Sequence, residues 1–403
     1  MSNPKGSVAT VVVSEAGDGD TTDIQTGIDL LPATGGVVYI REGTYTITNA
    51  ITITNDHTEI KGAGSSTIIQ TVGNINAIFA TNVDNISIHD VHIIGSGAGA
   101  NNEGIHFTTV TGSIITGCFI DTMGANCILL DTTSDNNRIV NNNLSISRSG
   151  IWLDASSSNI ISNNNINDMN YGAGPGYHGI ALLNGSDSNT LIGNVIDDCR
   201  LSGLYSYDAE RNTFTGNTSN NNRDGILIWG ITSATSNNVV SSNVFWYNDL
   251  GANLDYVNQT IIANNNFFDN IWGIYGSAIS RADDLTYITI TGNEFIQHGG
   301  NAIRISCSNV NDSHDIIITG NVFYNNGYDP GGSTIWLSDP SPRDIYRVII
   351  SGNTINTSGL YGINIGTSRV HDTSIINNTF IANSSGHIKD SGTDTHVFNN
   401  VEN

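Results

Sequence analysis

Short runs in which apolar and polar residues alternate recur along almost the whole chain. One kind of run contains Gly-Asn followed by a further apolar strand residue, as in Thr190-Leu-Ile-Gly-Asn-Val-Ile-Asp197 and Ile317-Ile-Thr-Gly-Asn-Val-Phe323. The other kind opens with Gly-Ile, as in Gly150-Ile-Trp-Leu153 and Gly225-Ile-Leu-Ile228. A period of two places side chains on two faces, so each run predicts a short β-strand with one buried face.

The asparagine of the Gly-Asn runs keeps one register through most of the chain. Neighbouring members of this series are 22 to 32 residues apart: Asn142, Asn164, Asn194, Asn217, Asn243, Asn265, Asn293, Asn321, Asn353, Asn378 and Asn400. We assign Cys118 and Asp90 to the same place in the two preceding repeats. An inward asparagine at a bend can bond the backbone of its own and the next repeat, which predicts a ladder of stacked amides. The alternative interpretation is that each asparagine marks an exposed turn.

A repeat of this length buries its apolar face only by stacking on its neighbours. Because no helical period runs through the repeats, strands of successive repeats are expected to pair in parallel. The pattern predicts an all-β, single-stranded parallel β-helix of about 13 coils. Residues 21–31 form the best helix candidate, with Thr22 or Asp23 as its cap. We expect residues 1–57 to supply a lead-in, this capping helix and the first strands, and residues 58–403 the β-helix.

Two segments near the start carry a family resemblance. Asp18-Gly-Asp-Thr-Thr-Asp-Ile-Gln-Thr-Gly-Ile-Asp29 and Gly35-Gly-Val-Val-Tyr-Ile-Arg-Glu-Gly-Thr-Tyr45 resemble the opening segment of polygalacturonases and phage tailspikes. The whole chain resembles the right-handed parallel β-helix proteins of the pectin-lyase-like superfamily. That resemblance implies a right-handed helix, and its tailspike members imply a homotrimer as one arrangement. It does not select a function, because the superfamily includes lyases, hydrolases, epimerases and inert virion proteins.

Composition excludes some partners. The formal net charge is −23, with only 14 Lys plus Arg. Nucleic acids and anionic membranes both require positive charge, so we expect neither as a partner. A strongly anionic polysaccharide would need Ca²⁺ or a local arginine cluster. The four cysteines show no metal spacing and predict no disulfide framework.

The location of the protein stays open. The sequence has no apolar N-terminal segment flanked by positive charge, so we expect no signal peptide in this chain, and no run is long enough to span a membrane. A virion or the extracellular surface are the settings that the resemblance implies.

Outward side chains of stacked coils form columns, because adjacent parallel strands lie about 4.8 Å apart. One such column consists of the residues two positions after each strand glycine. Together with the adjacent columns, it is richest in aromatic, acidic and arginine residues between Asp131 and Asp255. We predict a groove there. Its flat aromatic side chains suit the apolar face of a sugar ring: Trp152, Tyr205, Tyr207 and Trp229. The alternative is that these aromatics only cover strand edges.

Ionisable residues of the same region supply candidate chemistry. Asp131 and Asp154 fall on neighbouring coils, where two carboxyl groups can act as acid and base or hold Ca²⁺. Arg200 and Arg223, with Asp224, can neutralise an acidic sugar or stabilise an anionic intermediate. Solvated carboxylates and plain ion pairs are the alternatives for these groups.

The long corner 168–178 is the best candidate for a groove wall. It ends in Tyr177, a candidate substrate-binding residue, and His178, a candidate general base. The alternative for this histidine is a corner residue whose ring is satisfied by the backbone.

Residues 171–229 resemble the catalytic module of mannuronan C5-epimerases. The match is Asn222-Arg-Asp-Gly-Ile226, where that family has an arginine two residues before a strand glycine. The resemblance implies a site role for Arg223. In the same register, the family's catalytic Asp and His are replaced by Ala181 and Leu183, so epimerase activity is not expected.

The sequence predicts a carbohydrate-active β-helix protein that binds a polysaccharide in an outer groove. As a lyase or glycoside hydrolase it would cleave that polysaccharide. The predicted catalytic residues are Asp154, Arg223, His178 and Asp131, and the predicted substrate-binding residues are Trp152, Tyr205, Tyr207, Trp229, Arg200, Asp224 and Tyr177. No metal ligands are predicted. The alternative is a non-catalytic structural or adhesion β-helix, such as a viral tailspike or surface protein.

Overall fold

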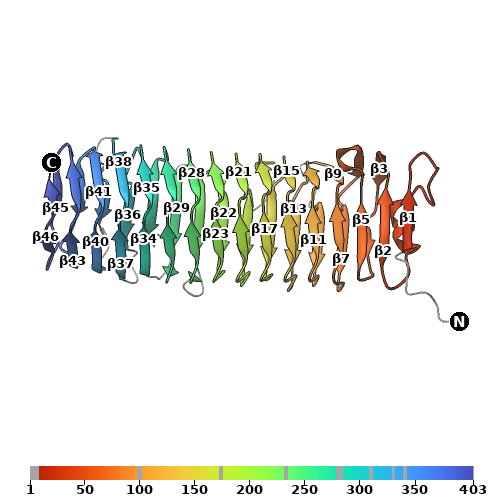
Figure 1. The fold of residues 1–403 in the computed structure, drawn as a ribbon, viewed down its shortest axis with the longest axis horizontal. Helices are drawn as coiled ribbons and strands as arrows, with labels where there is room; N and C mark the ends of the chain where they lie inside the picture. The colour runs from red at the N-terminus through yellow and green to blue at the C-terminus, as the bar shows by residue number, and fades with distance from the viewer. Residues whose placement is uncertain are drawn as a thin grey trace. The chain divides into compact units, whose positions relative to one another are not determined.

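The computed structural model describes residues 9–97, 102–171, 176–230, 235–277, 285–307, 312–328, 332–338 and 343–402. The chain divides into two compact units, residues 1–195 and 196–403, here called unit 1 and unit 2. Each unit is built from parallel strands that form three sheets, A, B and C (Figure 1). The boundary between the units lies within β21 (Val195–Asp197).

Most coils of unit 1 contribute one short strand to each sheet. Sheet A of this unit contains β1 (Ala9–Val13), β2 (Gly36–Ile40), β5 (Thr58–Lys61), β8 (Ser87–His89), β11 (Ile114–Thr116), β14 (Arg138–Val140), β17 (Ile160–Ser162) and β20 (Thr190–Ile192). Sheet B contains β3 (Gly43–Ile47), β6 (Thr67–Thr71), β9 (His92–Ile94), β12 (Phe119–Asp121), β15 (Asn143–Ser145) and β18 (Asn165–Asn167). Sheet C contains β4 (Ile51–Ile53), β7 (Ile78–Thr81), β10 (Ile105–Thr108), β13 (Asn126–Asp131), β16 (Ser149–Asp154) and β19 (Ile180–Leu183).

Unit 2 repeats this arrangement. Its sheet A contains β23 (Thr213–Thr215), β26 (Thr235–Ser236), β27 (Val239–Ser241), β30 (Val257–Asn258), β31 (Ile261–Ala263), β34 (Thr286–Thr291), β37 (Ser313–Thr319), β40 (Ile345–Ser351), β43 (Val370–Ile376) and β46 (His396–Phe398). Sheet B contains β24 (Thr218–Asn220), β28 (Val244–Trp246), β32 (Asn266–Phe268), β35 (Glu294–Ile296), β38 (Val322–Asn326), β41 (Thr354–Ser358), β44 (Thr379–Ile381) and β47 (Val401–Glu402). Sheet C contains β22 (Ser202–Tyr207), β25 (Asp224–Trp229), β29 (Leu250–Asp255), β33 (Trp272–Ser277), β36 (Ile303–Ser306), β39 (Ile335–Leu337), β42 (Tyr361–Ile365) and β45 (Gly386–Asp390).

The predicted all-β parallel β-helix is confirmed. Its coils number about 15, whereas the sequence predicts about 13. The difference arises near the start, because β1, β2 and β5 pair as early coils although their segments lack the Gly-Asn signature. Inward residues of successive coils meet in register and fill the core; Ile128 pairs with Ile151, and both are fully buried.

The asparagine ladder is confirmed within both units. In unit 1, the backbone N–H of Asn142 donates to Oδ1 of Asn164 at 3.0 Å. In unit 2, that of Asn293 donates to Oδ1 of Asn321 at 2.9 Å. Cys118 takes the expected place, since its N–H donates to Asn142 Oδ1. The assignment of Asp90 is wrong by one residue, because Thr116 pairs with His89 and Phe119 with His92, which aligns Cys118 with the residue after Asp90.

Further ladders lie beside this one. Asn137 and Asn159 begin a second in unit 1, and Asn222 and Asn248 begin a third in unit 2. Phenylalanine rings stack inside unit 2 with centroids 4.9 to 5.0 Å apart: Phe245, Phe267, Phe295 and Phe323. These columns satisfy buried backbone groups at the bends and fill the core between them.

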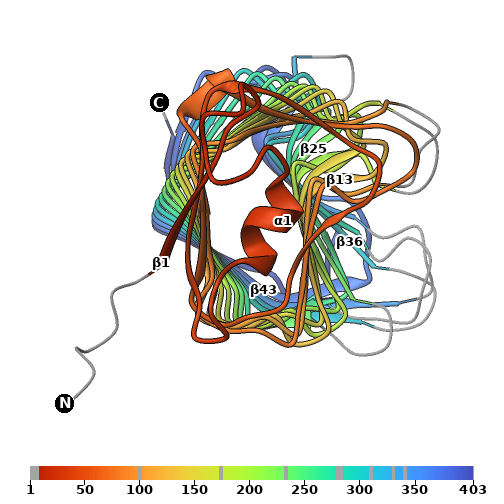
Figure 2. The same ribbon diagram turned by 90° about the vertical axis from the view of Figure 1, so that its right-hand side faces the viewer.

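Helix α1 (Ile24–Asp29) covers the N-terminal end of unit 1 (Figure 2), which confirms the predicted cap. It is shorter than the expected span 21–31. Asp23 is the N-cap, and its Oδ1 accepts a hydrogen bond from the Thr26 N–H at 2.7 Å. Ile24 and Ile28 are buried against the first coils, so the helix shields core residues that an uncapped coil would expose. A short 3₁₀ helix, η1 (Gly64–Ser66), lies between β5 and β6.

The four cysteines are buried free thiols. None of the described helices is long and apolar enough to cross a membrane. Parts of the long corners fall outside the described residues, including 172–175 of the predicted groove wall. The predicted boundary at residue 57 stays a prediction.

Candidate functional site

The outer face of sheet C carries most of the predicted site residues, in both units. In unit 1, the predicted outward column is in register: His106 pairs with Leu129, Leu129 with Trp152, and Trp152 with Ala181. Trp152 is half-buried, while the flanking Ile151 and Leu153 are fully buried. The indole therefore lies on the outer face, as predicted from the alternation.

Asp131 and Asp154 are direct register partners on β13 and β16. Asp131 Oδ2 lies 2.9 Å from Nε2 of His106, on the preceding coil. Asp154 Oδ1 accepts a hydrogen bond from the Asn184 side chain at 2.8 Å, on the following coil. The two carboxyl groups are thus neighbours, but each interacts with a different coil.

His106 is held by three partners. Asn76 Oδ1 accepts a hydrogen bond from the backbone N–H of Glu103 at 2.9 Å, which turns its Nδ2 to the Nδ1 of His106 at 3.1 Å. Nδ1 therefore accepts, and Nε2 of the neutral ring carries the proton that faces Asp131. Thr108 Oγ1 is also within 3.1 Å of Nε2. This arrangement fixes the orientation of the imidazole beside the carboxylate.

Glu103 is a functional candidate that the sequence analysis missed. Burial raises the pKa of its carboxyl group, against opposing effects of the Asn126 N–H, His106 and Arg148. Its Oε2 accepts the Asn126 N–H at 2.6 Å. A carboxyl group with a raised pKa near a polar cluster is a candidate general acid. The signal that could have found it is its place directly before Gly104, which matches the places of His178 and Asp224.

Tyr177 and His178 do not lie on the open face. Both are buried, with 8% and 6% of their surface exposed. The ring centroid of His178 is 6.3 Å from that of Trp152. The geometry therefore does not favour a role for His178 as an exposed base.

In unit 2, the predicted aromatic residues form one cluster. Tyr207 on β22 pairs in register with Trp229 on β25, and their rings meet edge to face with centroids 5.3 Å apart. The ring centroid of Tyr205 lies 6.0 Å from that of Tyr207. Tyr205 is 8% exposed, which corrects the expectation of an open stacking surface, and burial raises the pKa of its hydroxyl. Tyr207 and Trp229 remain half-buried and face outward.

Arg223 forms an ion pair with Asp224, as the alternative interpretation expected. Nε and Nη2 of Arg223 lie 2.9 and 2.8 Å from one carboxyl oxygen of Asp224. Asp224 is fully buried rather than on an open corner. Ser202 and Asn253 also donate to it. The guanidinium of Arg223 remains exposed, as does Arg200.

A second cluster on sheet C of unit 2 surrounds Arg304. The guanidinium carbon lies 4.8 Å from the ring centroid of Trp336, 5.3 Å from that of Tyr275 and 5.5 Å from that of Trp272. Tyr275, Arg304 and Trp336 are consecutive register partners on β33, β36 and β39. Nε of Arg304 and Nε1 of Trp336 are buried and have no hydrogen-bond partner within the described ranges. This cluster lies outside the groove predicted between Asp131 and Asp255, where the sequence is richest in aromatic, acidic and arginine residues.

Among the residues that the structure describes, no group of three or more His, Cys, Asp or Glu side chains is placed to hold a metal ion. Asp131 and Asp154 each have a protein partner instead. Ca²⁺ therefore stays a prediction from the sequence, without a formed site in the described part of the chain.

The comparisons with known proteins concern the fold. The family model for the right handed beta helix region matches residues 178–341. The catalytic domain of a GH87 alpha-1,3-glucanase variant in complex with tetrasaccharides is similar, with a TM-score of 0.55 and 16% identity over 99% of this chain and 71% of that chain. The A-module of the Azotobacter vinelandii mannuronan C-5 epimerase AlgE4 has a TM-score of 0.53 and 16% identity, over 93% and 94%.

PfbA, a surface adhesin of Streptococcus pneumoniae, has a TM-score of 0.50 and 18% identity over 94% of this chain and 93% of that chain. No curated protein sequence matches the chain. Together with the parallel coils, these likenesses define a right-handed parallel β-helix of the pectin-lyase-like fold. At these identities the likeness establishes the fold and leaves the function to the site.

Proposed function

We propose that this chain binds a polysaccharide on the outer face of sheet C. The observation that carries the proposal is the row Tyr275, Arg304 and Trp336, whose planar groups lie on three adjacent strands of unit 2. Aromatic faces suit the apolar faces of sugar rings, and the buried N–H donors of Arg304 and Trp336 lack acceptors within the described chain.

Other features support the same proposal. Trp152 in unit 1, and Tyr207 with Trp229 in unit 2, present further aromatic surface on this sheet. The neighbouring structures include a glucanase bound to tetrasaccharides and an adhesin, so the fold accommodates carbohydrate binding and attachment alike. The −23 net charge favours a neutral polysaccharide, unless Ca²⁺ or arginine offsets the repulsion.

The binding test uses a panel of neutral and acidic polysaccharides, with Trp336→Ala and Arg304→Met as the site variants. We expect each to weaken binding at least about tenfold, a loss of ~1.4 kcal/mol. Tyr324→Ala is the matched control, because Tyr324 is an exposed aromatic on sheet B. Absence of binding to every glycan, with and without Ca²⁺, would reject the proposal.

Cleavage is a second candidate, favoured by Glu103 and Asp131. The raised pKa of Glu103 makes it a candidate acid, and the carboxylate of Asp131, which is bonded to His106, is a candidate base. Such a pair serves a glycoside hydrolase or a lyase. Asp154 and Arg223, predicted from the sequence, are tested by their own alanine variants.

The cleavage test incubates the polysaccharides that bind with wild type, Glu103→Gln and Asp131→Asn. Products with ultraviolet-absorbing unsaturated ends would show a lyase, and new reducing ends without them a hydrolase. We expect both variants to lose product formation while binding persists. Binding without product from the wild type would instead identify a non-catalytic structural or adhesion protein. Light scattering of the intact chain tests the homotrimer that the tailspike resemblance implies.

A further inference from the structure

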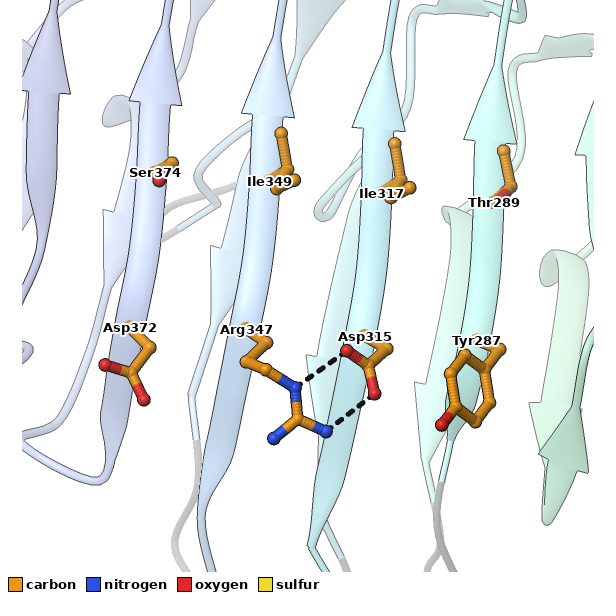
Figure 3. A pocket seen from close by; sticks show the side chains of 8 residues that line it. All are labelled: Tyr287, Thr289, Asp315, Ile317, Arg347, Ile349, Asp372 and Ser374. Atoms are coloured by element: carbon orange, nitrogen blue, oxygen red, sulfur yellow. Dashed lines mark hydrogen bonds and ion pairs between the residues drawn. The ribbon is translucent and has the colours of Figure 1, made fainter.

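A pocket of about 490 Å³ lies on the outer face of sheet A in unit 2, away from the residues proposed above (Figure 3). Four neighbouring strands build it: β34, β37, β40 and β43. Each gives one residue to the rim and one to the floor. The rim is Tyr287, Asp315, Arg347 and Asp372, and the floor is Thr289, Ile317, Ile349 and Ser374. The volume lies within the range of small-molecule sites in proteins.

The rim residues share an unusual backbone conformation. All four have positive φ, between 50° and 57°. They follow one another in register, because the residues on either side pair: His314 with Tyr346, and Ile316 with Val348. A left-handed tyrosine or arginine is unfavourable compared with glycine or asparagine. The four side chains lie in one row across neighbouring strands, on the same outer face (Figure 3).

The rim combines aromatic and hydrogen-bonding groups. Tyr287 is 54% exposed and forms one wall. Arg347 donates to both carboxyl oxygens of Asp315, from Nε and Nη2 at 2.7 Å each. This pair lowers the pKa of Asp315 to about 2, so its carboxylate stays charged. Figure 3 shows the other terminal nitrogen of Arg347 pointing away from Asp315.

Asp372 forms the far end of the rim. One of its carboxyl oxygens lies 3.1 Å from Nδ1 of His371. The other has no hydrogen bond to any described residue and remains an acceptor. Tyr287 and Asp372 are separated by three strand spacings, about 14 Å, a length that accommodates a disaccharide. The floor residues Ile317 and Ile349, both partly exposed, supply apolar surface between them.

From this arrangement we infer a second saccharide-binding site, on sheet A, that takes an uncharged disaccharide unit. One ring would stack on Tyr287. The other would place its hydroxyl groups on Arg347 and Asp372, with its apolar face on the two isoleucines. The rim carries two carboxylates and one guanidinium, so its net negative charge disfavours acidic sugars. This inference does not depend on the proposed function of sheet C.

Calorimetric titration of the intact chain tests the site with cellobiose, maltose and xylobiose, and with digalacturonate as the acidic probe. We expect at least one neutral disaccharide to bind with a Kd of about 1 mM or tighter, and digalacturonate to bind at least about tenfold more weakly. Tyr287→Ala and Asp372→Ala are each expected to weaken the neutral disaccharide about tenfold. Tyr324→Ala, which removes an exposed aromatic outside the pocket, is expected to leave it unchanged.

The outcomes separate the two faces. If Trp336→Ala abolishes disaccharide binding and Tyr287→Ala does not, the sheet A site is overturned and the sheet C proposal stands. If Tyr287→Ala weakens the disaccharide while polysaccharide binding is absent, the sheet A site stands and the sheet C proposal fails. Binding of none of the neutral disaccharides overturns the inference, and tighter binding of digalacturonate overturns its charge argument.

Discussion

His298 occupies an asparagine place in the third ladder, and its replacement by asparagine should remove a pH-dependent loss of stability. The ring is fully buried after β35. Its Nδ1 lies 3.2 Å from the backbone nitrogen of Asn270 and 3.1 Å from the Asn270 carbonyl oxygen, and the His298 N–H donates to Asn326 Oδ1. At the preceding step, Asn270 Oδ1 accepts the N–H of Asn248. The imidazole therefore replaces an amide that is neutral at every pH.

Burial lowers the pKa of His298 to about 4, from an ordinary value of 6.5. The unfolded chain then takes up a proton at a higher pH than the folded chain does. Stability is consequently intact above pH 6.5 and falls as the pH drops through 6.5 towards 4. The difference between the two pKa values, at about 1.36 kcal/mol per pH unit, gives ~3 kcal/mol at pH 4 and ~2 kcal/mol at pH 5.

The assay is urea unfolding of wild type and His298→Asn at pH 7.5 and pH 5.0, with hydrogen exchange of ladder amides as a local measure. We expect the stability difference between the two proteins to shift by ~2 kcal/mol in favour of the variant at pH 5.0. His396→Asn, on the exposed β46, controls for the loss of an imidazole in general. A shift below about 0.5 kcal/mol would refute the reasoning, as would a histidine resonance of His298 that titrates near 6.5.

Three further predictions test the ladder, the cap and the pocket. Asn293→Ala removes four hydrogen bonds inside the main ladder and leaves buried backbone groups unpaired, so we expect a loss of ~3 kcal/mol or more in urea unfolding at pH 7. Asp23→Ala removes the cap of α1 and should lower stability by ~1 kcal/mol, whereas Asp23→Asn should preserve most of it. Arg347→Met should raise the pKa of Asp315 from about 2 towards its ordinary range in a carboxyl NMR titration, while Arg369→Met should leave that pKa unchanged. An unchanged titration in Arg347→Met would contradict the assigned cause.

Much of the fold could be predicted from the sequence because the interactions that determine it are local and recur in each repeat. Alternating residues identify a strand with one buried face, and a fixed asparagine register identifies the bend at which coils stack. Asn142 and Asn164 could be placed against each other on spacing alone, and the structure bonds them. The register of Asp131 with Asp154 followed from the same count. The first coils were not included in the predicted number because β1, β2 and β5 lack the Gly-Asn signature. Asp90 was assigned to the ladder one residue before the position that the structure shows.

The site was less predictable, because burial and pairing depend on what the neighbouring coils contribute. The sequence placed Tyr205 on the outward column, but the side chains around it cover it. The sequence placed Asp224 at an exposed corner, but in the structure its side chain is fully buried. Glu103 shares with His178 and Asp224 the place before a strand glycine, but its raised pKa arises from burial at a corner that coil stacking creates.

The sequence alone determined that this chain winds into a parallel β-helix, which residues face inward and which side chains share a column. Only the tertiary structure decided which members of a column remain accessible, that Arg304 lies near three aromatic rings, and that four left-handed residues on sheet A line one side of a pocket. The physical reason is that strand alternation acts within a few residues. Accessibility, ion pairing and pKa are set by side chains about two dozen or more positions away, which become neighbours only after the coils stack.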